Sequence, residues 1–391
     1  MPNAFFRMAL AILKHPAELI MAHQPVAFTL QSDASVSPIR ISGSVQYMAG
    51  DSAQADYANM ATFELSDYLQ GLIIERGKTA SLPVIYITTP KVVSFVFQDY
   101  VGDPSVSGPE IQTNAYYLLD GYIPKSRRNA FYASYSNLLS YLKSSKSCLS
   151  WWPYNESKKI LPGQQEFINY LQVFSPISIP ITLNLVLVFT DGTTSNKGAV
   201  FTFDNVFYMG LVYFPTGYTQ LGIAAMAAAY TSKTLSGYKV SVNFGPPNHS
   251  EQISKVYTYI LDRNWYQNPR YLWIKNPFGL LEVLLCTGLG QQENSIKPEV
   301  VSTDGQSQPD KLIWRTVKSD VVKVSTGFLT AAQMQWLSDL IDTTEAYELI
   351  NGNLHPIIFR DISLAVAHDG EFQYSAELEY EYAYNEFNEQ G

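Results

Sequence analysis

The sequence predicts a mainly β fold of the α+β class, built from antiparallel, sandwich-like modules with a few short helices. Segments of alternating apolar and polar residues recur along the chain, and Gly, Pro, Asn and Asp turns separate them, which is the pattern of half-buried strands. Hydrophobic residues make up 46% of the 391 residues and aromatic residues 14%, whereas charged residues make up 16%. Globular proteins average about 25% charged residues. Such a chain can bury a large apolar core, which excludes global disorder.

In the first hundred residues, four segments have the pattern of strands. Residues 25–30 and 39–47 alternate apolar and polar side chains around a loop rich in Ser, Asp and Pro, so we expect them to pair. Residues 84–88 and 92–98 look similar and are separated by Thr89-Pro90. A surface loop is expected at residues 102–108, because Gly, Pro and Ser predominate there.

The middle of the chain contains a predicted hairpin and one further strand. Residues 183–189 are followed by Asp191-Gly192, a favoured hairpin turn, and then by the strand-like residues 199–203. Residues 238–244 alternate again and end at Gly245-Pro246-Pro247. Antiparallel pairing within this region is therefore expected.

The clearest predicted strand lies near the end of the chain. Apolar residues occupy every second position, and polar residues, mostly glutamates, occupy the alternate positions, so the two sets face opposite sides of one strand. The apolar set is Phe372, Tyr374, Ala376, Leu378, Tyr380, Tyr382 and Tyr384. We expect the glutamates, among them Glu377, Glu379 and Glu381, to face solvent or a basic partner.

Two helices are predicted with clear signals. The first begins at Thr330, where Gln333 completes a capping box and Met334, Leu337, Leu340 and Ile341 follow at helical spacing. The second covers residues 66–75, and both follow strand-like runs. Residues 131–143 and 164–171 are weaker helix candidates, and residues 224–230 remain undecided between helix and strand.

The sequence suggests three domains: a β-rich unit at 1–150 with one or two helices, a central β-rich unit at 151–295, and a C-terminal α+β sandwich-like module at 296–391. Residues 291–310 contain Pro298, Gly305 and Pro309 among polar residues, which indicates a linker or long loop. Beyond it we expect the order strand, helix, strand, turn, strand, turn, strand. The two turns are Asn351-Gly352 and Asp369-Gly370.

Charge and targeting signals narrow the classes of function. The net charge is −9. A protein that binds the phosphates of nucleic acids needs a basic surface, so no nucleic-acid binding is expected. The apolar run at residues 8–13 is too short for a signal peptide and is interrupted by Lys14, His15 and Pro16. No apolar stretch is long enough to span a membrane. We expect a protein made in the cytoplasm without a signal peptide.

No catalytic, metal-binding or cofactor-binding motif is found, so the sequence favours a non-enzyme without a cofactor. The five histidines lack metal-ligand spacing, and no nucleophile, Walker or dinucleotide-binding motif occurs. Glu377, Glu379 and Glu381 form one row on a strand face, which suits a solvated surface better than an acid–base pair. Cys148 and Cys286 lie in apolar surroundings, and their pairing in a disulfide is left open.

Two clusters are candidate contact sites, each with an alternative structural explanation. The basic residues Lys125, Arg127 and Arg128 form a solvated loop or contact an acidic partner, such as the glutamate row of a neighbouring copy. Trp151 and Trp152 are buried anchors or a platform on which sugar rings stack. The exposed tryptophans of a glycan-binding surface would also include Trp265.

Five stretches, in chain order, resemble one family. They are residues 15–30, 63–73, 149–153 with 165–171, 271–282, and 325–327 leading into the Thr330 helix, Tyr347 and the terminal strands. Together they resemble the β-rich, tail-associated structural proteins of phages and prophages that infect Bacteroidetes-type bacteria. His23-Gln24 departs from that pattern, in which an Asn is expected. In the fourth stretch, Asn276 and Gly279 fit a turn between strands, because Asn bonds the backbone and Gly supplies a positive φ.

This resemblance implies a non-enzymatic virion component of the tail tip, baseplate or tail hub, which assembles with copies of itself and with other tail proteins. It carries over no catalytic residue. The alternative is a cell-surface or tail-borne glycan-binding module, for which a host surface glycan would be the partner. A glycoside hydrolase with two distant carboxylates is a third, weaker interpretation.

Overall fold

The structure is a computed structural model, and it confirms the mainly β fold with several antiparallel sheets and a few short helices. It describes residues 10–14, 16–24, 27–32, 39–43, 47–53, 60–65, 69, 87–88, 91–100, 107–146, 148–153, 155–174, 179–245, 251–288, 290–302, 311–341, 343, 345–365 and 374–383.

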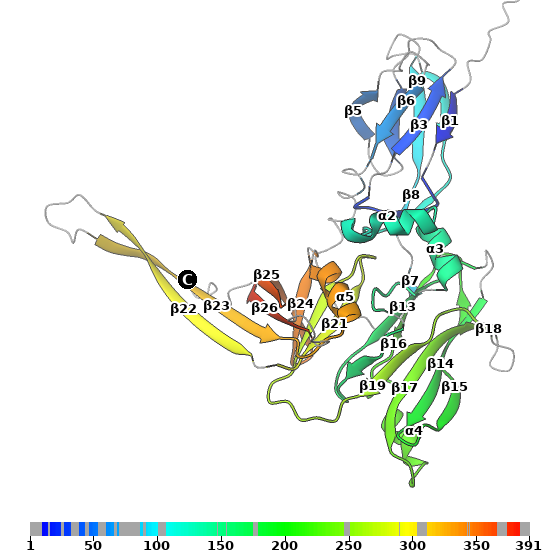
Figure 1. Ribbon diagram of the computed structural model, residues 1–391. Helices are drawn as coiled ribbons and strands as arrows, with labels where there is room; N and C mark the ends of the chain where they lie inside the picture. The colour runs from blue at the N-terminus through cyan, green and yellow to red at the C-terminus, as the bar shows by residue number, and fades with distance from the viewer. Residues whose placement is uncertain are drawn as a thin grey trace, which may run out of the picture.

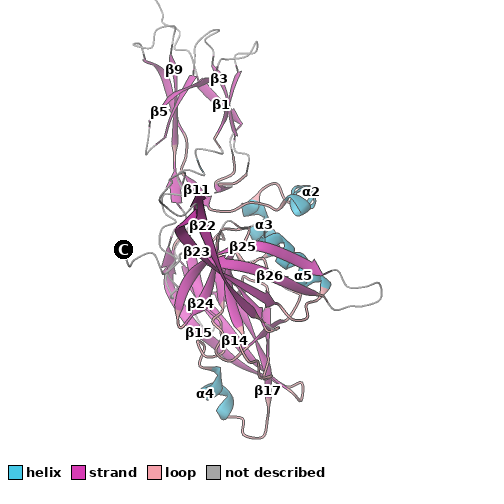
Figure 2. Cartoon of the chain, turned by 90° about the vertical axis from the view of Figure 1, so that its left-hand side faces the viewer, coloured by secondary structure: helices cyan, strands magenta, loops and turns pink. Residues whose placement is uncertain are grey.

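Two small sheets near the N-terminus pack face to face (Figures 1 and 2). The first has the order β1 (Leu10–Lys14), β3 (Ala27–Ser32), β6 (Met60–Glu64). The second has the order β10 (Ser107–Gln112), β9 (Phe95–Tyr100), β4 (Ile39–Gly43), β5 (Tyr47–Ala53). Phe28 of one sheet packs against Phe95 and Phe97 of the other, with ring centroids 5.2 and 5.1 Å away. Interlocking aromatic rings therefore form the core of this sandwich.

The expected pairing of residues 25–30 with 39–47 is wrong. The first segment becomes β3, which pairs with β1 and β6, and the second becomes β4 and the start of β5, which pair with each other. The first segment contributes the buried Phe28 and Leu30 to the core between the two sheets, so its partners are strands of its own sheet and not the segment that follows it in the chain. Chain order alone does not distinguish a hairpin from strands in opposite sheets.

A third sheet connects this sandwich to the rest of the chain. Its order is β2 (Leu19–Met21), β11 (Tyr116–Leu119), β8 (Lys91–Val93), and the β2–β11 pair is parallel. Helices α2 (Lys125–Ser134) and α3 (Leu138–Ser145) follow in the chain and pack next to this sheet (Figure 2). The predicted helix at 131–143 is thus two helices, because Tyr135 is extended and Asn137 begins the second with a capping box to Ser140.

The central strands form a six-stranded sheet faced by a short one. The larger sheet has the order β12 (Lys158–Ile160), β19 (Tyr257–Leu261), β17 (Leu235–Phe244), β14 (Ile179–Phe189), β15 (Thr194–Val206), and β18 (Glu251–Gln252) pairs with β17. The smaller one has the order β13 (Phe167–Leu171), β16 (Leu211–Pro215), β7 (Ile87–Thr88). Their apolar faces share one core.

Several predictions for this region can now be compared with the structure. The hairpin of residues 183–203 is confirmed as β14 and β15, with Gly192 at a φ of 79° in the turn. Residues 164–171 are not a helix: they contain β13, in which four consecutive side chains are buried, so no alternation shows in the sequence. The undecided residues 224–230 lie mainly in helix α4 (Ile223–Ala228).

A seven-stranded antiparallel sheet forms the C-terminal part of the molecule. Its order is β21 (Leu281–Cys286), β20 (Arg270–Lys275), β24 (Ala346–Ile350), β25 (Asn353–Ala365), β26 (Ser375–Tyr382), β23 (Lys311–Ser325), β22 (Gln291–Ser302). Helix α5 (Ala331–Ile341) covers one face, and its Trp336, Leu337 and Leu340 are fully buried there. The predicted capping box is present, because Thr330 and Gln333 exchange side-chain to backbone hydrogen bonds of 3.0 and 3.2 Å.

The linker or loop expected at residues 291–310 is wrong for its first twelve residues, which form β22. Residues 303–310 lie outside the described residues, as do most of the loop at 102–108, the helix at 66–75 apart from Leu69, and the Asp369-Gly370 turn. The three-domain division stays a prediction, and the seven-stranded sheet contains strands from both sides of residue 296.

Candidate functional site

The most distinctive feature is a long hairpin formed by β22 and β23. Its strands pair from Gln291 opposite Lys323 to Ser302 opposite Lys311, and the register shifts once, between Glu299 and Val300. Only Val321–Ser325 of β23 also pair with β26. We call residues 294–302 and 311–320 the arm. Within the described chain, its two strands pair only with each other, and Figure 1 shows them extending away from the other strands.

The root of the arm is held firmly in the core. Val322 and Val324 are buried beneath α5, together with Leu378 and Tyr380 of β26. Thr326, just after β23, exchanges hydrogen bonds with Ala376 of β26: its backbone N–H donates to the Ala376 carbonyl at 3.0 Å, and its hydroxyl accepts from the Ala376 N–H at 3.1 Å. The arm therefore starts from a rigid, well-packed sheet edge.

A buried ion pair stabilises the same sheet. The Arg270 Nη1 lies 2.6 Å from the Glu348 Oε1, and Glu348 is 3% exposed. The hydroxyls of Tyr380 and Tyr382 donate to the Glu348 Oε2 at 2.8 and 2.6 Å. Four side chains from β20, β24 and β26 are thus joined by charge-assisted hydrogen bonds. Burial, and then the hydrogen bond to Glu348, raises the pKa of Tyr382 to about 12.

We expect this network to make the folded state weaken at alkaline pH. Unfolded tyrosine loses its proton near pH 10, whereas burial raises the pKa of folded Tyr380 and Tyr382. Between pH 10 and about 12, the unfolded state therefore binds fewer protons than the folded state, so the free energy of unfolding falls as pH rises. Tyr382 can lower the free energy of unfolding by at most about 1.4 kcal/mol per pH unit. Its ring is partly exposed and screened by solvent, so the actual slope should be smaller.

Denaturant unfolding of the wild type and Tyr382→Phe at pH 8, 9, 10 and 11 measures this effect. The variant should have a shallower decline above pH 10. If the free energies of unfolding of the two proteins fall equally with pH, groups other than Tyr382 cause the decline.

The predicted glutamate row lies on β26 on the face opposite the buried Leu378 and Tyr380. Glu377 is exposed, the Glu379 Oε2 lies 3.5 Å from the Lys323 Nζ, and Glu381 pairs with Arg360. Two of the three carboxylates therefore pair within this chain, across strands of their own sheet. Exposed pairs of this kind contribute little stability.

The basic cluster is divided between two environments. Arg127 bonds Asp339 of α5, with its Nε 2.5 Å from the Oδ2 of that carboxylate, which is 2% exposed. Lys125 and Arg128 instead face a cavity between α2 and the β20–β21 turn. Asp339 was not singled out from the sequence, because a lone acid in a helix gives no sign of a partner 212 positions away.

Trp151 and Trp152 are partly buried and bonded within the chain. The Trp151 Nε1 donates to the Asp339 Oδ2 at 2.9 Å, and the Trp152 Nε1 donates to the Glu156 carbonyl at 3.0 Å. Trp152 also packs edge-on against Trp336, with ring centroids 4.8 Å apart. Both indoles therefore have their donors satisfied internally. Trp265, in contrast, is 83% exposed on the segment between β19 and β20.

The turn between β20 and β21 joins the C-terminal sheet to the N-terminal part. The Asn276 Oδ1 accepts from the backbone N–H groups of Phe278 and Leu280 at 2.9 and 3.0 Å. Gly279 has a φ of 84° and lies against the backbone of Asp120. The Asn351-Gly352 turn between β24 and β25 has φ values of 49° and 84°. Both turns use the left-handed conformations that Asn and Gly tolerate.

Neither cysteine pairs with the other in this structure. Cys148 and Cys286 are buried free thiols, and burial raises the pKa of each to about 12. Such thiols are largely protonated at neutral pH and are weak nucleophiles. Among the residues that the structure describes, no three His, Cys, Asp or Glu side chains gather as metal ligands would. No described helix has the length and apolar character needed to cross a membrane.

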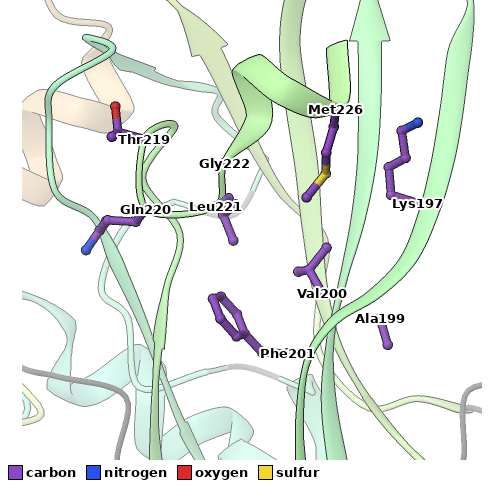
Figure 3. Close-up of a pocket in the computed structure, with 9 residues that line it drawn as sticks. All are labelled: Lys197, Ala199, Val200, Phe201, Thr219, Gln220, Leu221, Gly222 and Met226. Atoms are coloured by element: carbon purple, nitrogen blue, oxygen red, sulfur yellow. The ribbon is translucent and has the colours of Figure 1, made fainter. Parts of the chain in front are cut away.

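An open groove of about 530 Å³ lies between β15 and the turn that precedes α4 (Figure 3). Val200, Phe201, Leu221 and Met226 supply its apolar side chains. Lys197, at its rim, donates from its Nζ to the Tyr230 hydroxyl at 2.9 Å. Because Lys197 is the single charged residue of the lining, the groove offers contact area and no pair of groups for acid–base catalysis.

Comparisons with known proteins give only distant neighbours. No protein-family profile matches this sequence, and no curated protein matches it. Among solved structures, the tail of an empty gene transfer agent particle, refined with C6 symmetry, is 16% identical, covers 30% of this chain and 92% of its own, and has a TM-score of 0.22. The virion of a native gene transfer agent is 18% identical, with coverages of 29% and 92% and a TM-score of 0.20.

A 1.5-MDa bacterial ice-binding adhesin is a third neighbour, at 7% identity, with coverages of 82% and 92% and a TM-score of 0.19. Two of these neighbours are thus a tail and a virion of gene transfer agent particles. All three TM-scores lie below 0.5, so none of these likenesses carries an argument about what this chain does.

Proposed function

We propose that this chain is a non-enzymatic structural component of a phage tail or a related injection machine, placed at the tail tip, baseplate or hub and acting by oligomeric assembly. The observation that carries this proposal is the arm. A two-stranded ribbon is marginally stable in water by itself. Both of its edges present backbone N–H and C=O groups that a neighbouring strand can pair with. The arm therefore fits a contact element that is completed by copies of itself or by other tail proteins.

The rest of the molecule suits this role. A packed seven-stranded sheet holds the arm at its root, and the buried Arg270–Glu348 ion pair and aromatic contacts stabilise that sheet internally. Assembly needs such rigid modules, because a preorganised surface loses little conformational freedom on binding. The five sequence stretches that resemble tail-associated proteins lend independent support, while the bacterial group of the host stays a prediction.

An arm-shortened variant tests this proposal. Ser295 and Ser319 are register partners, so residues 296–318 can be replaced by an Asn-Gly turn that leaves the root intact. We expect the variant to melt like the wild type but to lose the oligomers that the full chain forms in light scattering and electron microscopy. Equal assembly of the two chains, or a strictly monomeric full chain, would contradict the proposal.

The second candidate function is glycan binding, and Trp265 favours it. This indole is the most exposed large apolar side chain among the described residues, at 83%, and such rings stack on sugars. A glycan array with the wild type and Trp265→Ser distinguishes the two functions. If the wild type binds a glycan and Trp265→Ser does not, the result would favour a glycan-binding module over a structural tail component.

A further inference from the structure

A polar cavity of about 450 Å³ lies where three parts of the chain meet. His23 and Asp120 line it from the segments after β2 and β11, and Lys125 and Arg128 line it from α2. Lys275 lines it from the end of β20, and Asn276 lines it from the turn that follows. Cavities at such junctions are frequent ligand sites. This cavity is separate from the arm and from the groove beside β15.

The charges around this cavity do not cancel. The Asp120 Oδ2 lies 2.5 Å from the Lys275 Nζ, and the Asp120 Oδ1 lies 2.8 Å from the His23 Nε2. Lys275 also reaches a Glu345 carboxylate oxygen at 3.5 Å. The positive charge of Lys275 is therefore balanced within the protein. Lys125 and Arg128 have no acidic partner among the described residues, although the chain as a whole carries a charge of −9.

Arg128 supplies the second observation. The residue is half-buried at the cavity wall, and its Nε has no hydrogen-bond partner within the described structure. Because the Nε is closed to solvent, an anion in the cavity would bond the other guanidinium nitrogens. A buried donor without an acceptor costs free energy, and the cost is larger when the donor belongs to a charged group. The acceptor that best suits a guanidinium is an oxyanion, because carboxylate and phosphate oxygens match the planar N–H fork.

The start of α2 adds to this electrostatic preference. Lys125 is the first residue of this ten-residue helix, Pro124 at its N-cap provides no side-chain hydrogen bond, and the first turn contains no acidic residue. The helix itself supplies no acidic residue to offset the positive end of its dipole, although Asp339 of α5 bonds Ser126 and Arg127 of the same turn. The part of the dipole field that Asp339 does not offset reinforces the charges of Lys125 and Arg128 beside the cavity.

We infer that this cavity binds a small molecule through an oxyanion, a phosphate or a carboxylate group, held by Arg128 and Lys125. The volume exceeds that of a bare phosphate ion, so it leaves room for a small organic body against the aliphatic stems of the basic side chains. The inference does not depend on the proposed assembly function.

Titration calorimetry on the full chain tests it with three probes: inorganic phosphate, glycerol 3-phosphate and citrate, each at an ionic strength matched with sodium chloride. We expect binding of at least one probe, and Arg128→Gln should weaken it about 10–150-fold, the range for one lost hydrogen bond to a charged group. If glycerol 3-phosphate binds more tightly than inorganic phosphate, the ligand is a phosphate ester. If citrate binds most tightly, the ligand is a carboxylate.

Lys125→Gln is the second variant, since its exposed side chain can be changed without disturbing the fold. Lys143→Gln, an exposed lysine on α3, is the matched control and should bind like the wild type. If no probe binds, or if Lys125→Gln and Lys143→Gln bind every probe equally well, the inference is wrong.

Discussion

Replacing Asp339 by alanine is expected to lower the free energy of unfolding by about 3 kcal/mol. The Asp339 Oδ2 accepts from the Arg127 Nε at 2.5 Å and from the Trp151 Nε1 at 2.9 Å, and its Oδ1 accepts from the Ser126 hydroxyl at 3.1 Å. The carboxylate is 2% exposed, so all of these donors lose an acceptor that water cannot fully replace. Arg127 is 39% exposed and can reach solvent, which keeps the loss at the lower end of the range for buried pairs.

Asp339→Asn separates charge from hydrogen bonding, because the amide retains one acceptor oxygen. We expect it to lose less than half as much stability as the alanine variant. Glu377→Ala, on the exposed face of β26, is the control and should stay within about 0.5 kcal/mol of the wild type. Urea unfolding measures all three variants, and an Asp339→Ala chain as stable as Glu377→Ala would show that the contacts of Asp339 contribute nothing.

Replacing Gly279 by alanine is expected to be more damaging than the same change at Gly192. Both glycines have a positive φ, of 84° and 79°, so each alanine pays about 1–2 kcal/mol for the left-handed conformation. At Gly279, however, the new Cβ would lie 2.1 Å from the Asp120 carbonyl oxygen, whereas at Gly192 it would meet no atom within 4 Å. Relief of that overlap should add about 1–3 kcal/mol, as overpacking does.

The pair of variants therefore measures how tightly the β20–β21 turn is seated against the N-terminal part. Thermal unfolding of both gives the difference directly. Equal destabilisation would mean that the turn and the Asp120 segment separate easily, and the junction cavity beside them would then also lose its wall.

The sequence predicted elements whose signals are local, and several of these are confirmed. The Asp191-Gly192 hairpin, the Thr330 capping box and the alternation along β26 each depend on residues close together in the chain. Elements determined by distant contacts were missed. Residues 167–171 have buried side chains on both faces of the strand, so apolar and polar residues do not alternate in the sequence. Without that alternation, the segment was predicted as a helix.

The arm was missed for a different reason. Residues 291–302 are mostly polar and contain Pro298, because a strand that projects from a sheet has no core to fill, so its sequence resembles that of a loop. The pairing with β23 is what makes it a strand. The cavity was not predicted. Lys125, Arg127 and Arg128 were singled out as a solvated loop or a contact for an acidic partner, whereas they lie in helix α2, and the juxtaposition of Lys125 and Arg128 with Lys275 and Asp120 depends on tertiary structure.

The attachment of the arm has a mechanical consequence. The root of β23 pairs with β26 from Val321 opposite Glu381 to Ser325 opposite Glu377. Hydrogen bonds between antiparallel strands run perpendicular to the strand direction. A tensile force along the arm axis would therefore load these bonds together, in shear, whereas a force at right angles would peel them apart one after another. The hairpin is built to resist pulling along its length, and it is most easily detached by sideways bending.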